Sequence, residues 1–230
     1  MNAAGIAVYS FDHYGHGKTQ SKLGHFPSYE AALFSVEELL IEAKADFPTL
    51  PLFIMGHSLG GNLVANLALK RKPDVKGVVL SAPYFRLAFS PSSVDVFLAK
   101  TMINIYPSFT QSSKLDASAI SRDGKEVKKY KDDPLVHDLV SPVLFLGCHQ
   151  AGEWAFEHAG DWKHPLLIMH GTEDRLTSHE ASEAFAKAAE GFGKSDVTLK
   201  LWDGLFHEMH NEPEKEEVLK TVSDWVLARV

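Results

Sequence analysis

Residues 51–71 read PLFIMGHSLGGNLVANLALKR, and this stretch decides the fold. The apolar run at 51–55 predicts a β-strand, and the spacing of apolar residues over 59–71 predicts an α-helix. Between them, residues 56–61 read GHSLGG, which has the form G-x-S-x-G. In a strand–turn–helix context, this pattern places the serine on a tight turn whose hydroxyl projects above the sheet. The stretch therefore predicts a catalytic serine, Ser58.

The residues around Ser58 have their own expected roles. Gly56 and Gly60, two residues before and two after, should let the strand and the helix pass closely. The N–H of Leu59 lies at the start of the predicted helix, where it can donate to a developing oxyanion. We therefore expect Leu59 to form part of an oxyanion hole.

Strands and helices alternate along much of the chain. Apolar, β-branched runs bounded by turn residues predict further strands at 6–11, 76–80, 165–169 and 197–202. Helical spacing of apolar residues recurs at 29–45 and from about 213 to 228. This alternation predicts the α/β class, with a mostly parallel sheet covered by helices on both faces.

One segment interrupts the alternation. From Ala82 to Trp162 there are helical patterns and loops but no convincing strand, although periodicity alone assigns 142–148 to neither a strand nor a helix. An insert of this size between two sheet strands predicts a helical cap, with the apolar side chains of 94–106 facing the catalytic cleft. We expect a core at 1–82, a cap at 83–162 without sheet strands, and a second part of the core at 163–230.

Two later loops offer partners for the serine. A serine hydroxyl is a weak nucleophile near neutral pH, so Ser58 requires a base and an acid that orients the base. Enzymes with this turn carry the acid first and the histidine second, each in a loop after a strand. The loop after 165–169 offers Glu173 or Asp174 as the acid. The loop after 197–202 offers His207 or His210 as the base.

Motifs along nearly the whole chain are shared with one family. They are FDHYGHGKT at 11–19, GHSLGG at 56–61, ISRDGKEVKKYKDDPLVH at 120–137, HGTEDRL at 170–176 and LFHEMHNEPEK at 205–215. In these motifs the chain resembles the monoacylglycerol lipase and lysophospholipase branch of the α/β hydrolases. The resemblance implies an α/β-hydrolase fold with the triad Ser58, Asp174 and His207. It also implies a cofactor-free lipase that hydrolyses lipid-like esters with one long acyl chain, which enter under the cap.

The resemblance leaves alternatives open and has one gap. Among esters, monoacylglycerols rank ahead of lysophospholipids and short-chain esters. Relatives begin earlier, and a His-Gly-rich loop in that region supplies a second oxyanion donor, which these 230 residues lack. Losing one such donor slows catalysis roughly 10²- to 10³-fold. The competing hypothesis is therefore a catalytically impaired remnant that binds a lipid or a partner.

The absence of this earlier region also affects which strands can pair in the predicted sheet. In relatives, another strand lies between the strand that corresponds to Ile6–Phe11 and the nucleophile strand. Unpaired backbone groups that stay buried are costly, roughly 1–3 kcal/mol each. We therefore expect Ile6–Phe11 to pair in parallel with Leu52–Met55, or to pair with a second copy of the chain in a homo-oligomer.

Composition limits the other classes of function. A formal net charge of −7, with no Lys/Arg run longer than 70–72, argues against a nucleic-acid partner. The single cysteine, Cys148, excludes an intrachain disulfide.

The first residues do not form a signal peptide and no apolar run approaches the roughly 18 residues of a membrane span, so we expect a cytoplasmic enzyme that can still contact a membrane through the cap. HEMH at 207–210 is one residue short of H-E-x-x-H, and DHYGHG at 12–17 is interpreted as a turn, so no metal is predicted.

Overall fold

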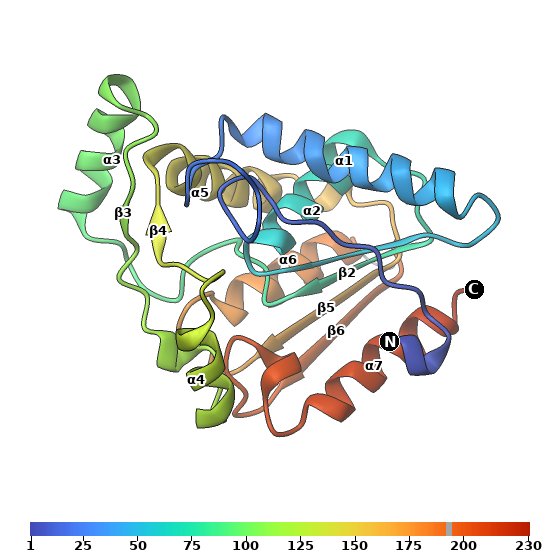
Figure 1. Cartoon of the computed structure of the whole chain (residues 1–230). Helices are drawn as coiled ribbons and strands as arrows, with labels where there is room; N and C mark the ends of the chain where they lie inside the picture. Colours follow the sequence, from blue (N-terminus) through green and yellow to red (C-terminus); the bar gives the residue numbers. More distant parts are fainter. Residues whose placement is uncertain (192–194) are drawn as a thin grey trace.

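A parallel β-sheet forms the centre of the molecule in the computed structural model, which describes residues 1–191 and 195–230 (Figure 1). Its strands within these residues are β1 (Phe53–His57), β2 (Gly77–Ser81), β5 (Leu166–Gly171) and β6 (Val197–Trp202). They lie in the order β1-β2-β5-β6, and every pairing between neighbours is parallel. The carboxyl ends of these strands therefore meet at one edge of the sheet.

Helices cover both faces of this sheet. On one side, α1 (Tyr29–Asp46), α2 (Leu59–Arg71), α5 (Pro142–Glu157) and α6 (His179–Glu190) share a hydrophobic cluster with the strands, and α7 (Lys215–Leu227) covers the other side (Figure 1). Strand β5 shows the alternation that produces two cores. Its Leu166 and Ile168 belong to the larger cluster, whereas Leu167 and Met169 belong to the cluster under α7. The predicted α/β-hydrolase architecture is confirmed.

Serine side chains fix the starts of three of these helices. The hydroxyl of Ser28 accepts from a backbone N–H in the first turn of α1, and Ser141 and Ser178 do the same for α5 and α6. Each such cap satisfies one N–H that has no partner within the helix and stabilises the fold by about 1 kcal/mol.

The segment between β2 and β5 is mostly helical. It contains α3 (Ser93–Ile105), β3 (Gln111–Ser112), η2 (Ala117–Ala119), α4 (Gly124–Asp132), β4 (Leu139–Val140), α5 and η3 (Ala159–Asp161). The expectation that it holds no sheet strand is wrong, because β3 and β4 pair antiparallel as a separate two-stranded ribbon. The chain between them turns back through η2 and α4, which brings the two short segments together beside the central sheet.

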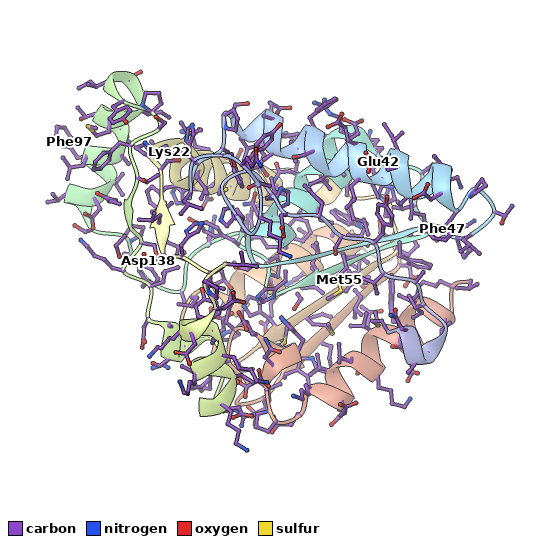
Figure 2. The ribbon with its side chains drawn as sticks, viewed as in Figure 1. Lys22, Glu42, Phe47, Met55, Phe97 and Asp138 are labelled. Carbon is purple, nitrogen blue, oxygen red and sulfur yellow. The ribbon has the colours of Figure 1, made fainter. Side chains whose placement is uncertain are left out.

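The two apolar helices of this segment have different surroundings. The run at 142–148 is the first half of α5, and the second half of that helix buries Ala155 against the central core. Helix α3 buries none of its residues, and Phe97 projects from it at the edge of the molecule (Figure 2). The described helices include none that is both long and apolar enough to cross a membrane.

The predicted strand at Ile6–Phe11 is wrong. This segment follows η1 (Asn2–Ala4), forms no strand, and makes no ladder with Leu52–Met55. Its end residues explain the path, because Ile6 packs against the cluster under α7 whereas Phe11 packs against the cluster on the opposite face. The segment therefore crosses from one face to the other instead of running along β1, and Val8 is 63% exposed. Pairing with a second copy of the chain stays a prediction.

Candidate active site

The turn between β1 and α2 holds Ser58 in a strained conformation. Its φ of 53° and ψ of −117° lie where residues other than glycine are rarely found. Backbone hydrogen bonds hold Ser58 in this strained conformation. The N–H of Ser58 donates to the carbonyl of Ser81 at 2.9 Å, and its carbonyl accepts from the N–H groups of Asn62 at 3.1 Å and Tyr84 at 3.0 Å. The end of β2 therefore fixes the turn that presents Ser58.

Two glycines make this turn possible, but they are not the two that were expected. A Cβ atom on Gly56 would lie 2.3 Å from the carbonyl oxygen of Gly60, so Gly56 is required. A Cβ atom on Gly60 would meet nothing within 4 Å, and the prediction that Gly60 allows the close approach is wrong. Gly61 has that role, because its Cβ would lie 2.9 Å from Cα of Pro83.

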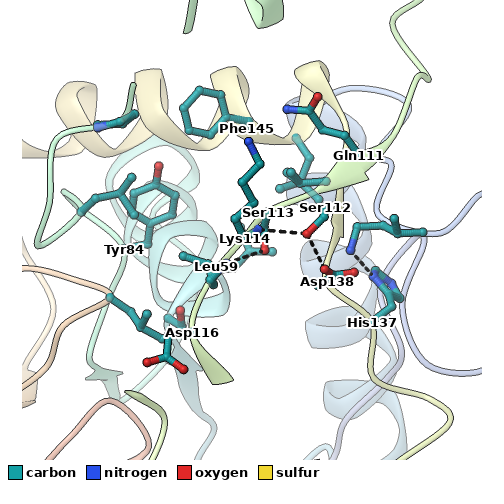
Figure 3. Close-up of a pocket in the computed structure, with 18 of the residues that line it drawn as sticks. Leu59, Tyr84, Gln111, Ser112, Ser113, Lys114, Asp116, His137, Asp138 and Phe145 are labelled. Carbon is teal, nitrogen blue, oxygen red and sulfur yellow. Dashed lines mark hydrogen bonds between the residues drawn. The ribbon is translucent and has the colours of Figure 1, made fainter. Parts of the chain in front are cut away.

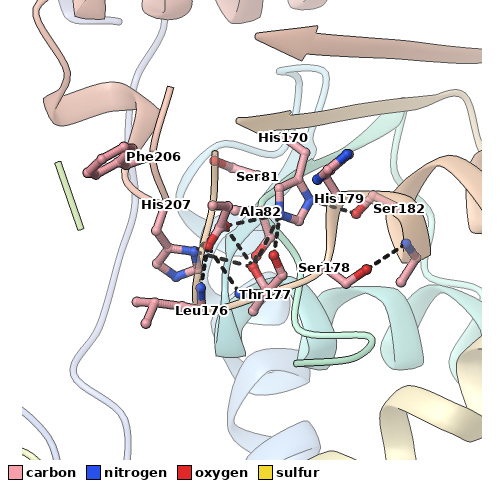
Figure 4. A network of polar contacts seen from close by, with 12 residues as sticks. Ser81, Ala82, His170, Leu176, Thr177, Ser178, His179, Ser182, Phe206 and His207 are labelled. Carbon is pink, nitrogen blue, oxygen red and sulfur yellow. Dashed lines mark hydrogen bonds and ion pairs between the residues drawn. The ribbon is translucent and has the colours of Figure 1, made fainter. Parts of the chain in front are cut away.

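The loops after β5 and β6 bring an acid and a base into contact. Nδ1 of His207 lies 2.6 Å from Oδ2 of Asp174, and the two side chains are 6% and 0% exposed (Figure 4). The competing acid, Glu173, is exposed to solvent. The competing base, His210, lies in η4 (Met209–Asn211), with its ring centroid 5.0 Å from that of His57. The geometry therefore favours Asp174 and His207 as the pair.

The carboxylate of Asp174 is buried, and hydrogen bonds from protein groups replace its contact with water. Its Oδ1 accepts from the N–H groups of Leu176 at 2.8 Å and Thr177 at 3.0 Å. Its Oδ2 accepts from the hydroxyl of Thr177 at 2.9 Å and from Nε2 of His170 at 3.0 Å, in addition to His207. Burial raises the pKa of Asp174, but the hydrogen bonds from His170 and His207 outweigh it and hold the pKa well below its usual range.

His170 is a site residue that the sequence reasoning missed. Its Nδ1 lies 2.8 Å from the hydroxyl of Ser182, and its Nε2 faces Asp174 and the carbonyl of Thr177 (Figure 4). Two partners of Nε2 only accept, and the third, the Thr177 hydroxyl at 3.2 Å, can also accept, so the ring carries its proton on Nε2 and accepts from Ser182 on Nδ1. The available signal was its place in HGTEDRL, four residues before Asp174.

A second histidine packs against the candidate base. The ring centroid of His57 lies 4.7 Å from that of His207, and its Nδ1 lies 3.2 Å from the hydroxyl of Ser81. Burial lowers the pKa of His57 well below its ordinary value, and the neighbouring His207 and His210 lower it further. His57 therefore stays neutral near pH 7 and places no second positive charge beside His207.

A single cavity of about 1040 Å³ opens over Ser58 and His207, both of which line it. One part of its wall is apolar and comes mainly from α3, α5 and the segments beside them: Leu87, Phe89, Leu98, Met102, Phe109, Leu144, Phe145 and Leu176. Another part is polar and includes Ser112, Ser113, Asp116, Lys131, Asp138 and Glu208 (Figure 3). The prediction that α3 faces the cleft is confirmed for Leu98 and Met102. Val94, Phe97 and Ile105 on the same helix are exposed.

The turn at 12–17 contacts residue 137, which belongs to the segment between β2 and β5. The carbonyl of Gly15 lies 2.6 Å from Nε2 of His137, and the ring of His16 lies 5.0 Å from the ring of His137. Residues 1–191 and 195–230 contain no group of three or more metal-ligating side chains placed to hold an ion.

Leu59 also lines the cavity, as the first residue of α2. The first N–H groups of a helix have no acceptor within the helix and lie at the positive end of its dipole. The position therefore suits a negatively charged oxygen beside Ser58.

The fold, together with a serine on the strand–helix turn that shares one cavity with the histidine of a buried histidine–aspartate pair, defines an α/β hydrolase. The family described as "Serine aminopeptidase, S33" matches residues 1–214, and the chain belongs to this family. It is 34% identical to the monoacylglycerol lipase of Mycolicibacterium smegmatis over 231 residues, which is 100% of this chain and 81% of that protein. An uncharacterised abhydrolase domain-containing protein of Dictyostelium discoideum is also 34% identical over 98% of this chain, although the chain spans only 24% of that protein's length.

A solved structure is also similar to this chain along its whole length. The crystal structure of the monoacylglycerol lipase of Paleococcus ferrophilus superposes with a TM-score of 0.91 at 33% sequence identity. The superposition covers 100% of this chain and 86% of that chain.

Proposed function

We propose that this protein hydrolyses the acyl ester of monoacylglycerols, with Ser58 as the nucleophile, His207 as the base and Asp174 as the orienting acid. The observation that carries the proposal is one large cavity lined by both Ser58 and His207, with Asp174 buried behind the histidine and bonded to its Nδ1. The similarity to proteins named monoacylglycerol lipase supports the choice of substrate.

We assign the proton transfers from the hydrogen bond between His207 and Asp174. Neutral His207 donates its Nδ1–H to Asp174, which leaves Nε2 to accept the proton of Ser58. Ser58 then attacks the ester carbonyl, and the protonated His207 returns the proton to the departing glycerol oxygen. Water repeats the sequence on the acyl-enzyme and releases the fatty acid. Asp174 stays ionised throughout and stabilises the imidazolium.

We assign the N–H of Leu59 as an oxyanion donor. It is the first residue of α2 and lines the cavity next to Ser58. A donor at this point interacts more strongly with the charged intermediate than with the neutral ester, which is the condition for accelerating the reaction.

The cavity wall suggests how the substrate lies. We assign residues 83–162 as the cap, whose apolar side chains from α3 and the start of α5 would contact the acyl chain. The polar part of the wall, which includes Ser113 and Asp138, would contact the glycerol. Burying each methylene of the chain stabilises the complex by about 0.8 kcal/mol, so a long acyl chain gains most from this wall.

The outer face of α3 suits contact with a lipid surface. Val94, Phe97 and Ile105 are 65%, 68% and 72% exposed, and a cluster of exposed apolar side chains is typical of an interaction surface. We propose that this face touches the membrane or micelle from which the substrate enters the cavity.

A panel of substrates tests the proposed function. It comprises a long-chain monoacylglycerol, a lysophosphatidylcholine of the same chain length, a chromogenic butyrate ester and an N-terminal amino-acid amide. We expect the largest kcat/KM for the monoacylglycerol. A larger value for the lysophospholipid or the butyrate would identify a lysophospholipase or a short-chain esterase instead. If no substrate is turned over and a fluorophosphonate probe fails to label the protein, the chain is the impaired remnant that binds a lipid or a partner.

A further inference from the structure

The carboxylate of Glu212 is buried and fully engaged although it lies outside the triad. Its side chain is 0% exposed, and its Oε1 accepts from the N–H of Phe206 at 2.8 Å. Its Oε2 accepts from Nε of Arg122 at 3.0 Å and from the N–H of the same arginine at 3.2 Å. A buried carboxylate that holds two distant segments in this way is expensive to leave unpaired, so the contact is strongly specified.

These two segments are the loop that carries His207 and residues 120–122 of the insert. Phe206, which Glu212 holds, directly precedes His207 in the chain. Glu208, which directly follows His207, donates its N–H to the carbonyl of Ile120 at 2.7 Å. The hydroxyl of Ser121 donates to the carbonyl of Asn211 at 2.9 Å. Both backbone neighbours of His207 are therefore fixed through Glu212 or residues 120–122.

Residues 120–122, which contact the loop that carries His207, also lie next to the substrate cavity. Ile120 lines the cavity, and so do Tyr130 and Lys131 of α4, the helix that follows residues 120–122. The same short segment therefore contacts the substrate space on one side and the base-carrying loop on the other.

We propose that Glu212 is a positioning residue, which acts with Arg122 to hold the His207 loop against the insert in the geometry that proton transfer requires. The proposal rests on the proposed function, because it assigns His207 as the base. A reacting group displaced by about 1 Å loses roughly 10²-fold in rate, so a small shift of this loop is enough to impair the base.

The experiment compares Glu212→Gln with Glu214→Gln in the full chain. Glu214 pairs with the outer nitrogen of the same arginine but is 41% exposed, which makes it a matched control. The measurements are kcat and KM for a chromogenic butyrate ester across pH, the rate of labelling by a fluorophosphonate probe, and the melting temperature. We expect Glu212→Gln to lower both kcat and the labelling rate by about 10²-fold with KM little changed.

Arg122→Gln covers the case in which Glu212→Gln does not fold. It removes the side-chain bond to Glu212 but leaves Glu212 bonded to the backbone N–H groups of residue 122 and Phe206, so we expect a smaller loss of kcat, of about tenfold. If the wild type is active but both variants match Glu214→Gln in kcat and in the rate of labelling, the proposal is wrong. A wild type that neither hydrolyses the ester nor takes the probe would instead refute the proposed function.

Discussion

Nε2 of His170 donates to Oδ2 of Asp174 at 3.0 Å, the same oxygen that accepts from the candidate base. The acid of the site therefore has a second imidazole partner from its own loop. Ser182 on α6 accounts for the other ring nitrogen, so the orientation of His170 is fixed on both sides. This arrangement keeps Asp174 charged and in place without any contribution from solvent.

Replacing His170 by leucine should destabilise the fold. Asp174 would lose one charge-assisted donor while staying buried, and such a loss lowers the free energy of unfolding by about 1–3 kcal/mol. Urea unfolding of the variant measures this change. His179→Leu, at a partly exposed position in the first turn of α6, is the control and should change the free energy by less than about 0.5 kcal/mol. Equal stabilities of the two variants would show that His170 does not support the acid.

The pH dependence of catalysis should depend on the imidazole of His207 and not on the carboxylate of Asp174. Asp174 has a depressed pKa, so its carboxylate stays ionised as the pH falls, and the stability that it contributes is lost only far into acid. Activity should nevertheless fall on acidification, because a protonated His207 cannot accept the proton of Ser58. A plot of log kcat/KM against pH should therefore have an acid limb of slope one. A flat profile, or a slope of two, would contradict this assignment.

A different histidine should make the fold sensitive to acid. Burial, with a smaller effect from His16, lowers the pKa of His13 to about 4, and its Nδ1 has no hydrogen-bond partner within residues 1–191 and 195–230. The unfolded chain binds a proton at this residue below about pH 6.5, whereas the folded chain does so only below about pH 4. Stability should therefore fall as the pH is lowered through this window, by at most on the order of 3 kcal/mol from His13.

The variant His13→Phe tests this linkage. Phenylalanine keeps the packing against Phe11 and Phe26 but cannot be protonated. The free energy of unfolding, measured by denaturant titration at several pH values, should fall less steeply in the variant between pH 6.5 and 4. Parallel curves for the variant and the wild type would rule out His13 as a source of acid sensitivity.

The apolar wall should set the acyl-chain preference. Met102 of α3 lines the cavity, whereas Phe97 of the same helix is 68% exposed. Met102→Trp should fill part of the space and reduce kcat/KM for long chains, by about fourfold for each methylene that no longer fits. Phe97→Trp is the control and should leave the chain-length profile unchanged. If the two variants have the same profile, the acyl chain does not lie along α3.

Much of the fold could be predicted because the relevant signals are local. The helix over 59–71 and the strand at 197–202 have the predicted bounds, and the elbow lies where G-x-S-x-G places it. The run at 142–148 could not be assigned, because seven apolar residues suit a buried strand as well as a helix. The structure forms a helix there, and a later residue of that helix, Ala155, packs against the central core.

The errors come from relationships that do not appear in a local pattern. Ile6–Phe11 has the composition of a strand, but a strand requires a neighbour, and its end side chains are buried on opposite faces of the sheet. Gly60 was chosen by its place in a motif, whereas the close approach of Pro83 to Gly61 depends on the path after β2. The contacts of Glu212 could not be expected either, because Arg122 lies 90 residues away in the chain.

The most direct test of the account is the hydrolysis of a long-chain monoacylglycerol by the wild type and by Ser58→Ala, with Ser35→Ala on α1 as a serine control remote from the cavity. The account predicts that Ser58→Ala lowers kcat by about 10⁴-fold or more and abolishes labelling by a fluorophosphonate probe. Ser35→Ala should behave as the wild type does, and all three proteins should have similar melting temperatures. If Ser58→Ala retains most of the wild-type activity, then Ser58 is not the nucleophile and the proposed mechanism is wrong.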